Sequence, residues 1–233
     1  MNSFNEEVVK LHVKPLIYGL VGPWFSGKRQ FAEFNNNNIV ACKIVSISEQ
    51  ALKDANKNGP NLDSANRAAL REHMVWQRTR NGADYFVKSL PLTKVENYTL
   101  IIVRSMKNKA EVEYLKSIGA KIVCITAEPE IRYKRYCVQA GKNAVSFETF
   151  VKNEKDDFPK LEESMKLADI FYENNEENYE RPGSKFHFNF CTDFQESLPA
   201  HFSQFKNGHN LFDYELSKQL MNSKHLVSEG SKT

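Results

Sequence analysis

The feature of the sequence that most constrains its fold is a glycine-rich segment that follows an apolar run. Residues 16–21 are almost entirely apolar, as in a buried strand, and Gly22 is separated from Gly27-Lys28 by four residues. A helix is predicted immediately afterwards, over 28–34. This strand–loop–helix order is typical of a P-loop, in which backbone N–H groups and the positive helix end bind phosphate. The alternative is a glycine-punctuated turn with a surface lysine.

Within this loop, Gly22, Ser26, Gly27 and Lys28 are the expected phosphate-binding residues, with Lys28 reaching toward the outer phosphates. One position departs from the motif. A P-loop has Ser or Thr after its lysine, whose hydroxyl binds Mg²⁺, and this chain has Arg29. A guanidinium group is always protonated and has no lone pair for a metal. ATP or another nucleotide is therefore the expected ligand, whereas the motif argues against magnesium.

The composition is that of a globular protein. The chain has 233 residues, of which 41% are hydrophobic and 26% charged, which suffices for one α/β domain with or without an appendage. The net charge of +3 is too small to indicate nucleic-acid binding by itself. No apolar run approaches the ~20 residues that a membrane helix needs, and residues 1–14 lack the apolar core of a signal peptide.

The four cysteines are widely spaced and form no Cys-x-x-Cys pair. Cys42 and Cys124 lie in strand-like apolar runs, where we expect small buried thiols. This pattern predicts an intracellular location and no structural zinc, and the six histidines show no metal-ligand spacing. We expect no metal site.

Strand-like and helix-like segments alternate along the chain. Further apolar runs lie at 39–47, 100–103, 122–126 and 169–172, with helical patterns at 48–53, 64–89, 109–118, 129–138, 146–150 and 162–168. Ser48 is the expected N-cap of the first of these helices, and the tract 35–38 is expected to be a loop. Strands without polar alternation indicate burial on both faces. The pattern predicts an α/β fold with a parallel, doubly wound sheet over 16–172.

The expected organisation is a lead-in over 1–15, the α/β domain over 16–180, a C-terminal extension over 181–226 and a disordered tail over 227–233. The extension is rich in aromatic residues, including Phe186, Phe188, Phe190, Phe194, Phe202, Phe205 and Phe212. These rings either pack back on the domain or dock a protein partner.

Five segments together resemble a known family. They are Val21–Lys28, Ile102–Leu115, Ile131–Arg135, Ser146–Phe150 and Ala168–Ile170. Their order resembles nucleotide kinases, in particular archaeal proteins related to dephospho-CoA kinase and the kinase-like N-terminal domain of fungal deoxycytidylate deaminases. The resemblance covers roughly residues 16–175 and implies the three-layer P-loop NTPase fold of nucleotide kinases. The zinc-deaminase motifs His-x-Glu and Pro-Cys-x-x-Cys do not occur, so deamination does not carry over.

The resemblance assigns roles to two residues at strand ends. The related kinases have a magnesium-binding acid after the strand at 100–103, where this chain has Arg104. With Arg29, both expected magnesium positions are arginines, which with Lys28 would form an anion hole that holds phosphate without metal. We expect the side chain of Arg104 to lie within reach of the loop. The alternative is that the alignment with the related kinases is shifted by one residue, in which case Arg104 is a surface arginine. Glu49 occupies the place of an acid that contacts the acceptor and is a candidate base or orienter.

Two further arginines, Arg132 and Arg135, resemble lid arginines that close on phosphates, with a solvated helix face as the alternative. After Phe150 the related kinases carry more basic residues, whereas this chain has Asn153, Glu154 and Asp156.

The leading hypothesis is a kinase-fold protein with a degenerate magnesium site, acting as a nucleotide-binding or scaffolding pseudokinase-like subunit of an intracellular assembly. One alternative is an active ATP-dependent kinase of a nucleoside monophosphate or a similar small acceptor. Another is a nucleic-acid-associated protein that uses the basic helices expected at 64–90 and 130–142.

Overall fold

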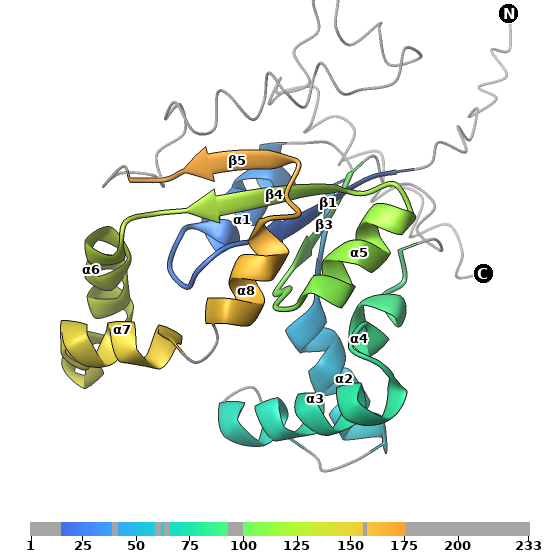
Figure 1. Ribbon diagram of the computed structural model, residues 1–233, viewed down its shortest axis with the longest axis horizontal. Helices are drawn as coiled ribbons and strands as arrows, with labels where there is room; N and C mark the ends of the chain where they lie inside the picture. The colour runs from blue at the N-terminus through green and yellow to red at the C-terminus, as the bar shows by residue number, and fades with distance from the viewer. Residues whose placement is uncertain are drawn as a thin grey trace, which may run out of the picture.

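Figure 1 shows the computed structural model, which describes residues 15–38, 42–58, 62, 66–92, 100–155 and 158–175. The expected C-terminal extension and tail, and the lead-in apart from Pro15, lie outside the described residues.

The centre of the fold is a five-stranded sheet in the order β2-β3-β1-β4-β5. The strands are β1 (Leu16–Val21), β2 (Cys42–Ser46), β3 (Leu100–Arg104), β4 (Lys121–Thr126) and β5 (Ile170–Glu173). Every neighbouring pair is parallel, which confirms the expected α/β fold. β1 lies in the middle, so the segment that follows it emerges between the carboxyl ends of β3 and β4.

The helices connect these strands and cover the sheet (Figure 1). They are α1 (Lys28–Asn38), α2 (Ile47–Asn58), α3 (Arg67–Asn81), α4 (Tyr85–Lys88), α5 (Lys109–Ser117), α6 (Pro129–Ala140), η1 (Gly141–Asn143), α7 (Phe147–Lys155) and α8 (Phe158–Met165). α6 and α7 lie together beyond the carboxyl end of β4, at the left of Figure 1. We call residues 129–155 the α6–α7 arm.

Both faces of the sheet are buried because successive strand residues alternate between two cores. On one face, Ile17, Ile101 and Ile122 belong to a core that also takes in residues of α2–α5 and α8. On the other face, Leu20 and Ile102 belong to a core with residues of α1. Helices on both faces of a parallel sheet give three layers, and they explain why these strands read as continuous apolar runs.

Two helix ends differ from the expectation. α1 continues through the asparagine tract that was expected to be a loop, and Asn35 is buried with its amide donating to Phe31 O at 2.7 Å. Packing of the helix against the sheet outweighs the weak helix propensity of asparagine. α2 begins at Ile47, so Ser48 is not its cap. The hydroxyl of Ser46 accepts from the Glu49 N–H at 3.4 Å instead.

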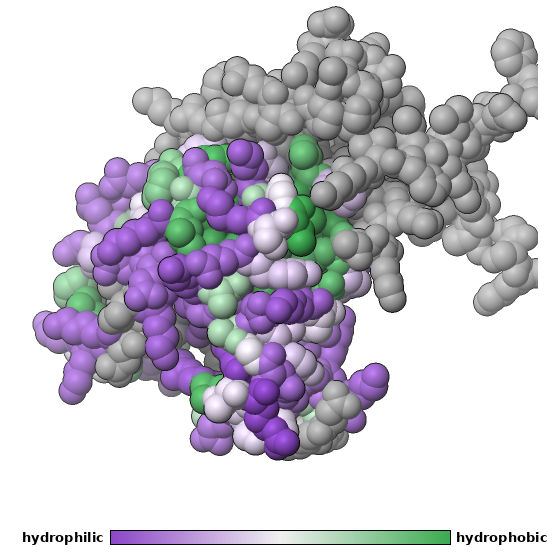
Figure 2. Space-filling view, turned by 45° about the vertical axis from the view of Figure 1, so that its right-hand side comes forward, coloured by the Kyte–Doolittle hydropathy of each residue, from purple (hydrophilic) through white to green (hydrophobic). Residues whose placement is uncertain are grey.

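The surface seen in Figure 2 is mainly hydrophilic over the described residues, with small separate hydrophobic areas. The large exposed apolar side chains come from several elements: Trp24, Val75, Trp76, Val138, Val145 and Phe171. None of the described helices is both long and apolar enough to cross a membrane.

Candidate phosphate-binding site

The loop at 22–27 joins the central strand β1 to α1, as the motif predicts. Gly22 has a φ of 135°, and a Cβ atom there would lie 2.0 Å from the carbonyl oxygen of Ile125 in β4. Gly27 has a φ of 105°. Gly22 is therefore required by both its backbone conformation and its close approach to β4, and Gly27 by its conformation.

The carbonyl groups of the loop are held by side chains. Three consecutive carbonyls accept hydrogen bonds: Trp24 O from Arg132 Nη1 at 3.3 Å, Phe25 O from Arg135 Nη1 at 3.1 Å and Ser26 O from Asn174 Nδ2 at 2.8 Å. In the described part of the chain, the N–H groups of Gly27, Lys28 and Arg29 donate no hydrogen bond. Carbonyls engaged by neighbouring elements and unengaged amides at a helix start are the arrangement that binds a phosphate.

Lys28 folds back across the loop. Its ammonium group donates to Gly22 O at 2.7 Å and to Pro23 O at 2.5 Å, and lies 3.4 Å from Ser26 Oγ. Burial lowers the pKa of Lys28 to about 7, and the positive charges of Arg132 and Lys107 contribute to the lowering. An anion in the loop would offset this repulsion and favour the charged ammonium.

Arg29 occupies the position of the metal-binding hydroxyl, but its side chain follows α1 away from the loop. Its Nε lies 2.6 Å from Glu33 Oε1, and 69% of the Arg29 side chain is exposed. Exposed ion pairs of this kind stabilise by only about 0.3–0.5 kcal/mol. Arg29 is thus held weakly and is not brought together with Lys28.

The structure brings the other two strand-end candidates, Glu49 and Arg104, together. Arg104 Nη2 lies 2.5 Å from Glu49 Oε1, which links the end of β3 to the first turn of α2. Nε of Arg104 is buried and has no hydrogen-bond partner among the described residues. The charge of Arg104 is therefore balanced by Glu49, the candidate base.

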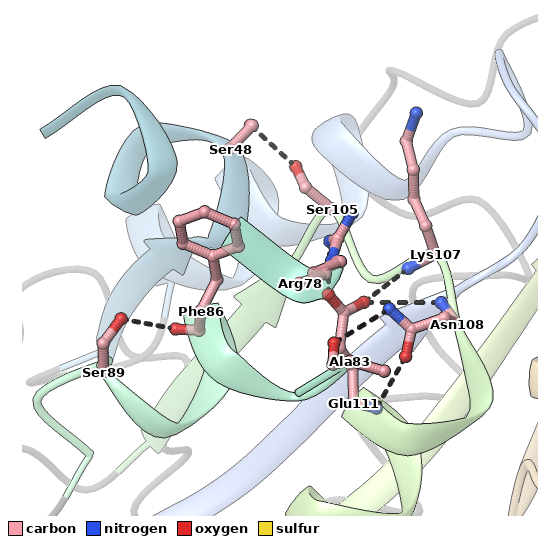
Figure 3. A network of polar contacts seen from close by, with 9 residues as sticks. All are labelled: Ser48, Arg78, Ala83, Phe86, Ser89, Ser105, Lys107, Asn108 and Glu111. Atoms are coloured by element: carbon pink, nitrogen blue, oxygen red, sulfur yellow. Dashed lines mark hydrogen bonds and ion pairs between the residues drawn. The ribbon is translucent and has the colours of Figure 1, made fainter. Parts of the chain in front are cut away.

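Three serine hydroxyls lie beside this pair. The oxygens of Ser46, Ser48 and Ser105 are 2.9–3.3 Å apart, so they form one hydrogen-bonded group at the ends of β2 and β3. Ser105 has a φ of 70°, which is uncommon for a residue with a side chain. Figure 3 shows Ser105, which follows β3, facing Ser48 in the first turn of α2.

The two arginines of the α6–α7 arm contact protein groups. Arg132 is buried, forms an ion pair with Glu154 and donates from Nε to Ala127 O at 3.0 Å. Arg135 donates to Asn174 O at 2.8 Å as well as to the loop. The structure therefore brings both arginines to the backbone of the loop, where they hold its carbonyl groups. Glu154 neutralises Arg132.

Phe25 fixes the loop to the same arm through ring contacts. Its φ is 60°, and its ring centre lies 5.5 Å from that of Tyr136 and 6.1 Å from that of Phe150. The loop is consequently attached to α6 and α7 by an aromatic cluster as well as by the arginines.

Two residues of the site were not among the candidates from the sequence. Asn174 follows β5 and is buried against Ser26. Lys107 follows β3, and its ammonium lies 5.6 Å from the centre of the Trp24 ring. Lys107 lies in one of the segments that resemble the kinases, only three residues after Arg104. This position in the sequence could have marked it as a candidate site residue. Asn174 lies in an asparagine-rich stretch, in which no sequence pattern distinguishes it as a site residue.

The residues present fit the phosphates of a nucleotide but not a magnesium ion. Amide groups, Lys28 and the start of α1 are donors and positive ends, which suit an anion. At both expected metal positions the side chain is a guanidinium, which offers no lone pair. Among the described residues, no group of three or more His, Cys, Asp or Glu side chains is arranged to hold a metal.

The parallel sheet, the loop after its central strand and the helices on both faces define a P-loop kinase-like fold. Among solved structures, the chain matches TT1252 from Thermus thermophilus with 17% identity and a TM-score of 0.53, over 80% of this chain and 100% of that one. This likeness confirms the fold.

Two kinases of known name also match. Shikimate kinase from Bacteroides thetaiotaomicron matches with 11% identity and a TM-score of 0.46, over 78% of this chain and 97% of that one. Dephospho-CoA kinase from Campylobacter jejuni matches with 16% identity and a TM-score of 0.44, over 79% and 98%. No family model and no curated protein matches the sequence.

Proposed function

We propose that this chain binds the phosphate groups of a nucleotide such as ATP without a divalent cation, does not transfer them, and acts as a pseudokinase-like subunit of an intracellular assembly. The observation that carries the proposal is the ion pair between Arg104 and Glu49. By the resemblance to nucleotide kinases, Arg104 stands where those kinases have a magnesium-binding carboxylate, and Glu49 balances its charge.

An electrostatic argument supports the loss of the magnesium site. Two unit charges at 4 Å interact by about 4 kcal/mol at an effective dielectric constant of 20. Replacing an attractive carboxylate by a guanidinium therefore changes the energy of a nearby divalent cation by several kcal/mol. Glu49 offsets part of this change, but its carboxylate is then occupied by Arg104 and is not available as a general base.

Phosphate binding is supported by the loop itself. The N–H groups of Gly27, Lys28 and Arg29 donate no hydrogen bond within the described residues. Three loop carbonyls are held by Arg132, Arg135 and Asn174, and Lys28 lies across the loop. These features need no metal, because backbone N–H groups and an ammonium bind phosphate oxygens directly. Arg132 and Arg135 donate hydrogen bonds to loop carbonyls. These two guanidinium groups are therefore not available to stabilise the charge of a phosphoryl-transfer transition state.

A turnover assay tests the proposal. The full chain is incubated with Mg-ATP and a panel of acceptors that includes nucleoside monophosphates, dephospho-CoA and shikimate, and ADP release is followed. The proposal predicts no release above that of a Lys28→Gln variant. Turnover near the ~1–100 per second of ordinary kinases would support the active-kinase alternative and overturn the proposal.

A nucleic-acid role has one supporting observation. On α3, Arg80 lies 4.8 Å above the exposed ring of Trp76, as in stacking platforms for bases. Arg78 of the same helix instead bonds the buried Glu111. Binding of single-stranded RNA that weakens steeply with salt would favour this alternative, and the absence of binding would remove it.

The assembly role depends on residues 181–226, which lie outside the described part of the chain. We propose that this aromatic segment contacts the protein partner. Co-purification of the full chain, compared with a chain that ends at residue 180, tests this point. Loss of the same partner on truncation is expected, and retention would contradict it.

A further inference from the structure

We propose that Lys107 takes the place of the divalent cation, so that Lys28 and Lys107 together bind the adjacent phosphates of a metal-free polyphosphate chain, as in a nucleoside triphosphate, at the Trp24 side of the loop. This inference rests on the proposed function, and it identifies the residue that replaces the metal.

The backbone of Lys107 is fixed by a fully buried carboxylate. Its N–H donates to Glu111 Oε2 at 2.8 Å, and the N–H of Asn108 approaches the same oxygen at 3.4 Å. Arg78 of α3 binds the other oxygen of Glu111 at 2.5 Å. Figure 3 shows this network. A segment tied to two helices holds its side chain in a defined place.

The side chain of Lys107 leaves this network and extends away from the Glu111 carboxylate (Figure 3). Its ammonium reaches the indole of Trp24, 5.6 Å from the ring centre. Trp24 is the third residue of the loop, and its carbonyl is held by Arg132. Lys107 therefore connects the segment after β3 to the phosphate loop, the same two elements that hold the metal in P-loop kinases.

Lys28 and Lys107 lie near enough for their charges to interact. The charge of Lys107 is among the causes that lower the pKa of Lys28. Two ammonium groups that repel each other across a loop favour a ligand that carries several negative charges in a row. A lysine ammonium is a compact charge with three donors, and, unlike a metal ion, it needs no carboxylate ligands. A polyphosphate fits this arrangement better than a single phosphate, which one ammonium already satisfies.

The two tryptophans of the chain make a direct experiment possible. Trp76 lies on α3, so a Trp76→Phe parent keeps Trp24 beside Lys107 as its one indole reporter. Inorganic triphosphate and orthophosphate are titrated into this parent in EDTA while Trp24 fluorescence is recorded. The variant is Lys107→Gln in the same parent. The matched control is Lys109→Gln, because Lys109 is exposed, is paired with Glu113 on α5 and loses the same charge.

We expect Lys107→Gln to weaken triphosphate binding at least tenfold, which corresponds to about 1.4 kcal/mol, and orthophosphate binding less than threefold, because only the longer ligand loses a charged hydrogen bond. Lys109→Gln should bind triphosphate as the parent does. Equal triphosphate affinity in the parent and Lys107→Gln would overturn the inference and leave phosphate binding intact. Equal weakening for both ligands would overturn the polyphosphate assignment. A parent that binds neither ligand, by fluorescence and calorimetry, would overturn the proposed function as well.

A fold control keeps the result interpretable. The side chain of Lys107 is exposed, and the bond to the buried Glu111 is made by its backbone. Loss of the side-chain contact with the Trp24 ring should cost little stability at this exposed site, so its variants should unfold within a small shift of the parent's urea midpoint. Lys107→Met is a second variant that removes the charge while keeping an unbranched side chain of similar length. A triphosphate affinity for Lys107→Met that equals the parent's would overturn the inference.

Discussion

Asn174 donates a hydrogen bond from Nδ2 to the carbonyl oxygen of Ser26 at 2.8 Å, across 148 positions of the sequence. Asn174 is buried, and its own N–H donates to Thr126 O at 2.7 Å. Arg135 in turn donates to the carbonyl of Asn174 at 2.8 Å. One residue after the last strand therefore joins the phosphate loop, β4 and the α6–α7 arm.

Removal of this amide should loosen the loop. In Asn174→Ala the carbonyl of Ser26 loses its partner, and we expect a loss of about 1–3 kcal/mol in unfolding free energy together with weaker nucleotide binding. Urea denaturation and a titration with ATP in EDTA measure the two effects. Asn175→Ala, on the partly exposed neighbour whose side chain accepts from the Glu128 N–H, is the control and should bind ATP normally. Unchanged binding in Asn174→Ala would show that the loop keeps its shape without this bond.

The buried pair of Arg132 and Glu154 should be costly to break. Their side chains are 6% and 11% exposed, so Glu154→Gln leaves a buried charge without its counter-ion. We expect a loss of roughly 2–4 kcal/mol in urea denaturation, and recovery of most of it in the Arg132→Met, Glu154→Leu double variant. Glu162→Gln on α8 removes an exposed ion pair and should change the stability by less than about 0.5 kcal/mol. A similarly small effect of Glu154→Gln would mean that the pair is not formed in solution.

Nucleotide binding should depend on pH through Lys28, whose pKa of about 7 lies below the ordinary 10.5. A bound anion raises this pKa, so binding takes up a proton above pH 7, and the affinity for ATP in EDTA should fall by up to about tenfold per pH unit from pH 7.5 to 9. Calorimetry across this range measures the slope. Lys28→Gln should bind weakly with no such slope, and a flat profile in the wild type would contradict a neutral Lys28 in the free loop.

The same pKa shift of Lys28 should make the folded state more stable as the pH rises, whereas it makes ATP binding weaker. The unfolded chain keeps the Lys28 proton up to about pH 10.5, whereas the folded chain releases it near pH 7. Between these values the unfolded state binds more protons, so the Lys28 contribution to unfolding free energy rises with pH. Urea denaturation of the wild type against Lys28→Gln measures this contribution, which should be absent in the variant.

Phe25 combines an unfavourable backbone conformation with favourable ring packing. Phe25→Ala removes the ring but keeps a side chain at a φ of 60°, whereas Phe25→Gly removes both. We expect both variants to be less stable than the wild type, because the contacts with Tyr136 and Phe150 are lost. Phe25→Gly should be the more stable of the two by about 1 kcal/mol. Equal stability would indicate that the left-handed conformation is not maintained.

The fold could be predicted from the sequence because its signals are local. The apolar runs at 100–103 and 122–126 lack polar alternation, and both are central parallel strands. The helix expected between them at 109–118 is observed as Lys109–Ser117. The asparagine tract was misjudged because the helix through it depends on packing against the sheet, which composition does not reveal.

The site could be predicted only in part, because its key pairings join distant elements. Gly22 and Lys28 were evident from one continuous motif. The partners of the arginines were not, since Arg104 meets Glu49 across 55 positions and Arg132 meets Glu154 across 22. Residue types predicted charge at the site, but only the arrangement of strands and helices shows which charges neutralise each other.

The metal dependence of ATP binding by the wild-type chain tests the central claim most directly. Calorimetry with ATP is carried out once in EDTA and once in excess magnesium. The account predicts binding in EDTA with a dissociation constant no more than about threefold weaker than in magnesium, a difference of under about 0.7 kcal/mol. Binding that appears only with magnesium, or that magnesium tightens more than about tenfold, would contradict it.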